Sequence, residues 1–248
     1  MKKTIIGLLI IAVAVCLGYC FYRSICIEAT PDAKAEKRYE ALLAAYGGDV
    51  NGAYKSGVTP IFEAINRGDK EVIQKLIAAG ADLNVETGCI GRPLSWALLR
   101  GDSDIVKLLV QNGADINAKY ICKDNVLVTW TKRGDKRRVQ MLLDNGADIN
   151  APGRWERTPL HAAVKIGDIE MVKTLVKAGS DVNAKKHGWE TALLIAVQRN
   201  YTEIVKYLLE KGADVNVKDR EERTVYAIAL KHAKKEIIDL LRKHGATE

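Results

Sequence analysis

Histidine and aspartate are the residue types of this 248-residue chain best suited to catalysis or metal binding. The four histidines lack the companion residues of a catalytic triad or a metal site. The aspartates recur at one constant interval inside a Gly-Ala-Asp context, which is typical of turn residues that accept hydrogen bonds from nearby backbone amides. We therefore predict a scaffold role, no enzyme activity, no cofactor and no metal. The residues are His161, His187, His232, His244, Asp82, Asp115, Asp148, Asp181 and Asp214.

The aspartates belong to a longer unit that repeats in one phase. Gly80-Ala81-Asp82-Leu83-Asn84 recurs with a constant period of 33 up to Gly245-Ala246. Between these copies a pair such as Thr158-Pro159 predicts the start of a helix, because the hydroxyl can cap free amides and proline fits the first turn. A glycine such as Gly167 then ends it, and apolar residues at helical spacing predict a second helix. Each unit is expected to be two short antiparallel helices and a projecting loop.

These residues resemble the ankyrin repeat: the run TPLHAA at 158–163, the Gly-Ala-Asp-x-Asn turn and the period of 33. The resemblance covers about residues 35–248 and implies an all-α solenoid with six repeats and an N-terminal half-repeat cap. It also implies protein binding through loops and inner helices, and a structural hydrogen-bonding role for His161. One helix pair cannot bury its own apolar face, so stability must come from neighbouring units. The expected units lie near 51–83, 84–116, 117–149, 150–182, 183–215 and 216–248.

The N-terminal segment predicts a membrane anchor. A charged start, residues 1–3, precedes nineteen uncharged residues at 4–22, and a linker follows at 23–34. A spanning helix needs about 20 residues, whereas the apolar part of a secretory signal has about 7–15, so the length favours an uncleaved transmembrane helix in the lipid bilayer.

Two alternatives to the anchor stay open. Ala12-Val13-Ala14 resembles a signal cleavage site, and Cys16 or Cys20 could carry a lipid. We expect a single-pass membrane protein with the repeat domain outside the cytoplasm, because a long domain translocates largely regardless of flanking charge. The alternative is a secreted or periplasmic protein, or a lipoprotein, after leader cleavage.

Charge indicates the kind of partner. Three of the seven net positive charges lie before Glu28, and the remaining four are too few to favour nucleic acid as a partner. However, four arginines share the last exposed position of the first helix in their units, and a row of this kind favours a protein partner with an acidic surface. The alternative is a solvated face on which arginine is favoured by the helix dipole. The row comprises Arg67, Arg100, Arg133 and Arg199, and Ile166 interrupts it.

The loop tips supply a second set of candidate binding residues. Aromatic residues and arginine are typical interface anchors. Trp155 and Trp189 lie in neighbouring loops, where they are expected to form one patch, although local packing within each hairpin is the alternative. The set comprises Tyr54, Lys55, Tyr120, Arg154, Trp155, His187 and Trp189.

One unit departs from the pattern. Trp130 occupies a column that holds alanine in the other units, and Arg138 replaces an apolar residue. A large ring in a small-residue column must push its neighbours apart or swing outward. Unpaired burial of Arg138 would be costly, so the unit is either a specialised contact or a decayed repeat.

The function predicted from these patterns is a membrane-tethered, non-catalytic protein-binding module. The alternative is an extracytoplasmic inhibitor or immunity protein that blocks one enzyme or toxin. The sequence gives no indication of oligomeric state or of the partner's identity.

Overall fold

The computed structural model describes residues 31–54, 57–87, 91–118 and 124–247. The chain divides into two compact units, Met1–Arg38 and Tyr39–Glu248, and the account below concerns the second. The predicted anchor at 4–22, with its alternatives at Ala12 to Cys20, and the loop residues Lys55 and Tyr120 lie outside the described residues. Within the described part of the chain, none of the helices has the length and apolar character needed to cross a bilayer.

The described residues form α-helices and one short 3₁₀ turn, with isolated bridges but no strand. The all-α fold class predicted from the repeat is therefore confirmed. The elements are α2 (Pro31–Ala45), α3 (Pro60–Arg67), α4 (Lys70–Ala78), α5 (Pro93–Arg100), α6 (Ser103–Gln111), α7 (Val126–Lys132), α8 (Lys136–Asp144), η1 (Arg154–Glu156), α9 (Pro159–Ile166), α10 (Ile169–Lys177), α11 (Ala192–Gln198), α12 (Thr202–Glu210), α13 (Val225–His232) and α14 (Lys235–Lys243).

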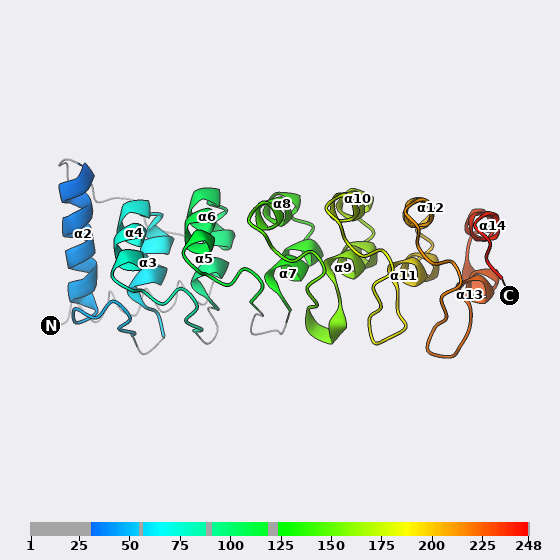
Figure 1. Ribbon diagram of the computed structural model, residues 1–248, viewed down its shortest axis with the longest axis horizontal. Helices are drawn as coiled ribbons and strands as arrows, with labels where there is room; N and C mark the ends of the chain where they lie inside the picture. The colour runs from blue at the N-terminus through cyan, green and yellow to red at the C-terminus, as the bar shows by residue number, and fades with distance from the viewer. Residues whose placement is uncertain (1–30, 55–56, 88–90, 119–123, 248) are drawn as a thin grey trace, which may run out of the picture. The chain divides into compact units, whose positions relative to one another are not determined.

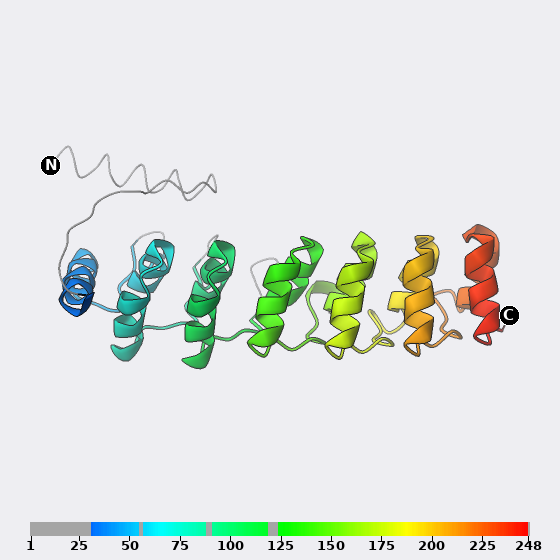
Figure 2. The same cartoon turned by 90° about the horizontal axis from the view of Figure 1, so that it is seen from above.

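Six helix pairs follow one another in chain order, from α3/α4 to α13/α14 (Figure 1). First helices pack on first helices, as in α3 on α5 and α9 on α11, and each also packs on the second helix of its own pair. Figure 2 shows the pairs side by side in the order of their colours. The hairpins that join successive pairs lie along one edge in Figure 1, so residues one repeat period apart come from equivalent places in neighbouring layers.

Local sequence explains where the first helices begin and end. Thr158, Thr191 and Thr224 cap their helices as predicted, whereas Thr59 makes no cap bond. In the irregular unit Asn125 takes over this role and accepts a hydrogen bond from the Val128 amide at 2.7 Å. Gly167 adopts the predicted left-handed conformation after α9, with φ of 76°. Its counterpart Ala233 stays extended, because a Cβ disfavours the left-handed region.

The core is aliphatic and continuous from layer to layer. The second helices bury the predicted apolar residues, such as Ile105, Val106 and Leu109, which are fully buried. Ile238 of the last helix is the exception, since it is only partly buried. The neighbour interfaces therefore hold the apolar surface that a single helix pair could not bury.

A ladder of asparagines links the turns between layers. The Asn84 Oδ1 accepts the Asp115 amide at 2.8 Å, and its Nδ2 donates to the Gly113 carbonyl at 2.9 Å. Asp82 in turn accepts the Asn84 amide at 2.8 Å, which confirms the predicted role of the repeated aspartates as turn residues. The other asparagines that accept a backbone amide of the next unit are Asn51, Asn117, Asn150, Asn183 and Asn216.

Candidate functional surface

The predicted arginine row lies at the exposed ends of the first helices, and three of its four members have partners inside the protein. Arg67 forms an ion pair with Glu63 at 2.9 Å. Arg100 donates to the Asn66 carbonyl at the end of the preceding first helix, α3. Arg133 stacks on Trp130, with 4.7 Å between the guanidinium carbon and the ring centroid. A guanidinium with such a partner is only partly available to another protein.

Arg199 is the fourth member of the row, and it forms no ion pair with any residue that the structure describes. It lies at the C-terminal end of α11, exposed, where the helix dipole favours a cation. The row therefore carries its least engaged charge at α11 rather than spreading it evenly over the layers.

The irregular unit is a packed contact in which both unusual residues have partners. Trp130 is 6% exposed, and the Arg138 guanidinium lies 4.6 Å from its ring centroid. Arg138 also pairs with Asp135 and donates to the carbonyls of Leu98 at 2.5 Å and Leu99 at 2.8 Å. These contacts compensate the cost of partly burying the Arg138 guanidinium. Both unusual residues of this unit are thus held by contacts within the chain.

The step between α5 and α7 shows the effect of the large ring. These two helices pack less closely than the other consecutive first helices, such as α7 and α9. Arg138 bridges this step from α8 to the end of α5. The ring is thus accommodated by separation of the neighbouring layer, the first of the two outcomes expected from its size.

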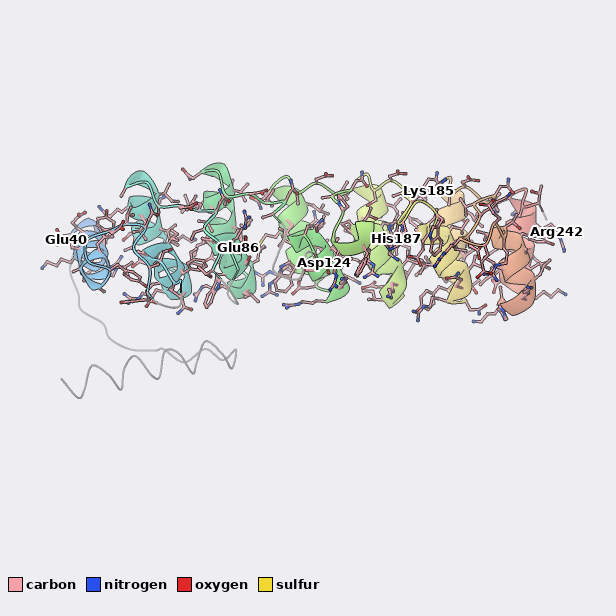
Figure 3. The ribbon with its side chains drawn as sticks, turned by 90° about the horizontal axis from the view of Figure 1, so that it is seen from below. Glu40, Glu86, Asp124, Lys185, His187 and Arg242 are labelled. Carbon is pink, nitrogen blue, oxygen red and sulfur yellow. The ribbon has the colours of Figure 1, made fainter. Side chains whose placement is uncertain are left out.

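Arg154 and Trp155 form a presented loop tip. Trp155 is 57% exposed and adopts a left-handed conformation with φ of 62°, which is uncommon for a bulky residue. Arg154 lies 4.9 Å from its ring centroid, and the Arg154 amide donates to the buried Asp124 carboxylate at 2.8 Å. The preceding layer therefore holds this tip in place. Figure 3 looks onto the hairpins and labels Asp124 and His187, which flank the tip in the chain.

The aromatic patch differs in membership from the one predicted. Trp155 makes an edge contact with His187 at 6.2 Å between ring centroids, whereas Trp189 is partly buried against the core. Tyr54 is 43% exposed and contacts Tyr46 with tilted rings, 4.3 Å between the ring centroids. Trp189 therefore packs locally, because it is partly buried against the core.

His161 has the structural role implied by the resemblance. Its Nε2 donates to the Glu190 carbonyl at 3.0 Å, since that oxygen can only accept, and its Nδ1 accepts the Thr158 hydroxyl at 2.7 Å. Burial lowers the pKa of this imidazole, and the bond to Glu190 opposes the shift. His161 thus ties α9 to the next hairpin as a neutral side chain.

Two further cations lie on the same surface, and the sequence interpretation overlooked one of them, Arg157. In one layer Lys132 pairs with Asp124, eight residues before it. In the next layer Lys165 is equivalent to Lys132, and Arg157 is equivalent to Asp124. A cation therefore replaces the carboxylate at this position. Comparison of the column just before each first helix, unit by unit, would have revealed this exchange.

Metal ligands do not cluster in the described residues, where no group of three or more histidine, cysteine or acidic side chains is arranged to hold an ion. The surface consists of helix ends and hairpin tips rather than an enclosed cavity. Its geometry suits contact with another macromolecule.

Comparison with known proteins agrees with this fold. A family model described as ankyrin repeats (3 copies) matches residues 33–120, 126–219 and 186–247. The crystal structure of an ankyrin repeat domain from Acinetobacter baumannii AYE is similar, with 29% identity, a TM-score of 0.65, and coverage of 76% of this chain and 98% of that one. No curated protein matches the chain. Ankyrin repeats typically serve as non-catalytic scaffolds for protein–protein interaction. With a family match over most of its length, the chain belongs to the ankyrin-repeat family.

Proposed function

We propose that this protein is a membrane-tethered binding module whose hairpin tips and first-helix ends bind a protein partner with an acidic surface. The observation that carries the proposal is the exposed position of arginine side chains at the ends of the first helices α3, α5, α7 and α11. Arg67 and Arg133 represent this row in separate layers. Such an arrangement attracts an acidic partner and fixes its orientation more than it adds affinity.

The presented tip at Arg154 and Trp155 supports the same surface. An exposed tryptophan held in one conformation gives contact area with little entropy to lose on binding, which is typical of an interface anchor. The tip and the row lie on the hairpin and first-helix side of the layers, so one partner can contact both.

The tether and the location belong to the proposal as well. The apolar length of residues 4–22 supports an anchor, and the orientation favoured by the sequence places the repeats outside the cytoplasm. Protease accessibility in intact cells, together with the mass of the mature N-terminus, tests both points. Protection of the repeats from external protease would contradict the extracytoplasmic placement, and a mass that lacks the leader would contradict the anchor.

Capture of partners by the full chain in a neutral detergent tests the binding surface. We expect the double variant Arg67→Glu with Arg133→Glu to retain about a tenth or less of the captured partner at low salt, because rim charges steer association. The matched control is Lys107→Glu with Lys177→Glu, which reverses two exposed charges on the second helices α6 and α10. Equal capture by both variants would contradict the proposal. Capture of one enzyme that stays bound at high salt would instead support the inhibitor alternative.

A further inference from the structure

The residue column just before the first helices is charged at α7, α9, α11 and α13, and this charge is paired in three of the four layers and unpaired in one. Asp124 pairs with Lys132, Glu190 pairs with Lys186, and Arg223 pairs with the buried Asp219. The equivalent residue in the remaining layer is Arg157, which forms no ion pair with any residue that the structure describes. These four positions are equivalent in four successive repeat units.

Lys165 and Arg199 share this lack of a carboxylate partner. Lys165 lies in the last turn of α9, and Arg199 follows α11, which packs on α9. Together with Arg157 they form a set that we call the unpaired cation cluster. The Glu190 carboxylate acts on the Lys165 ammonium, but it forms its ion pair with Lys186.

The charges of Arg157 and Arg199 both act on the Lys165 ammonium. The Arg157 guanidinium lowers the pKa of the Lys165 ammonium, and burial and the charges of Lys186 and Arg199 act in the same direction. Glu190 opposes the shift without reversing it. The free protein therefore carries a local repulsion that an incoming carboxylate would relieve.

Apolar side chains stand exposed around the cluster. Ile166, next to Lys165 in the chain, is 42% exposed, and Trp155 precedes Arg157 by two residues on the loop tip. Ile166 is also the residue that interrupts the arginine row. A partner segment that neutralises the cluster can therefore place an apolar side chain beside its acidic groups.

We propose that the unpaired cation cluster, with Ile166 and Trp155 beside it, binds an acidic segment of the partner protein that carries an apolar side chain. This inference rests on the proposed function and assigns its main contact to the layers of α9 and α11. Charge complementarity selects the occupant, because a carboxylate segment supplies the partners that these three cations lack.

Arg157→Glu tests the cluster without any ligand. The substitution restores the arrangement of Asp124 and Lys132 in this layer, so it relieves repulsion and adds an ion pair. We expect the Tm of the full chain in neutral detergent to rise by about 1–3 °C. The matched control Lys177→Glu, with the same change of charge on α10, is expected to leave the Tm within about 1 °C. A fall in Tm on Arg157→Glu would overturn the cluster.

The same variants test binding. The probe is a labelled ten-residue peptide with five Glu residues around one Leu, and its matched peptide has Gln in place of every Glu. We expect the full chain to bind the acidic probe, and Arg157→Glu to weaken that binding by about tenfold or more while Lys177→Glu weakens it by less than about threefold.

Three results would overturn the inference: no binding of the acidic probe, equal binding of the neutral peptide, or equal losses in the two variants. Phosphatidylserine vesicles that compete with the peptide in proportion to their charge would assign the cluster to an anionic surface instead. Partner capture that depends on Arg67 and Arg133 but ignores Arg157→Glu would sink this inference and leave the proposed function standing. If Arg157→Glu abolished probe binding but the wild-type chain captured no partner, the proposed function would fail and this inference would stand.

Discussion

At the scale of single residues, the same side-chain type serves different purposes at equivalent positions. Arg100 donates to the end of α3, whereas Arg133, one repeat later, stacks on Trp130. The sequence predicted their common exposure, because position in the repeat fixes which face a residue occupies. The sequence could not predict their partners, because alignment of the units does not show which atoms of its own or a neighbouring layer a side chain contacts.

Arg138 should stabilise the protein despite its charge. Arg138→Ala removes two hydrogen bonds to carbonyls, the contact with Trp130 and the ion pair with Asp135, so we expect a loss of about 2–3 kcal/mol in the free energy of unfolding. Urea unfolding followed by circular dichroism measures it. The exposed neighbour Arg137 is the control, with an expected change within about 0.5 kcal/mol for Arg137→Ala. Equal effects of the two substitutions would contradict the packed role of Arg138.

His161 should make stability depend on pH between 7 and 5. Burial lowers its pKa, so the unfolded chain takes up a proton near the usual value of about 6.5 while the folded protein does not. Its contribution is present above pH 6.5 and is lost as the pH falls through that value. We expect the unfolding free energy of the wild-type chain to decrease in this window and that of His161→Gln to change less. Parallel pH profiles would refute the assignment.

At the scale of helices, the left-handed glycines that follow the first helices meet different neighbours. A Cβ at Gly68 would lie 2.9 Å from Arg100 Nη2, and one at Gly167 would lie 2.9 Å from the Tyr201 ring. The repeat predicted the glycines, because their conformation is local. Helix bounds were less predictable. Helix α2 begins at Pro31, inside the expected linker at 23–34, because the period of the repeat does not fix where this first helix starts.

Gly167 and Gly134 separate backbone strain from contact between layers. Both have positive φ, of 76° and 69°, but a Cβ at Gly134 would meet nothing within 4 Å. We therefore expect Gly134→Ala to cost about 1 kcal/mol in unfolding free energy and Gly167→Ala about 1–2 kcal/mol more, because the methyl group displaces Tyr201. Thermal or urea unfolding of the two variants side by side gives the difference. A cost at Gly134 as large as at Gly167 would show that backbone strain alone accounts for both.

At the scale of the molecule, the constant period of the repeat was sufficient to predict the family, the helix pairs and the buried faces. One cause explains this success, since each layer depends on its neighbours and must repeat their pattern. Residues that depart from the repeat pattern account for the features that the period did not predict. The separation of α5 and α7 follows from Trp130, and the concentration of unpaired charge near α9 follows from Arg157, a residue outside the repeat motif.

The central claim is that the partner contacts the hairpin and first-helix side. Photo-reactive residues placed singly at Lys132 and Lys165, on first helices, and at Lys107 and Lys177, on second helices, test it in intact cells with the full chain. The account predicts that one protein with an acidic surface is cross-linked from the first-helix positions and gives little or no product from the second-helix positions. Cross-links to that protein from α6 and α10 alone would contradict it.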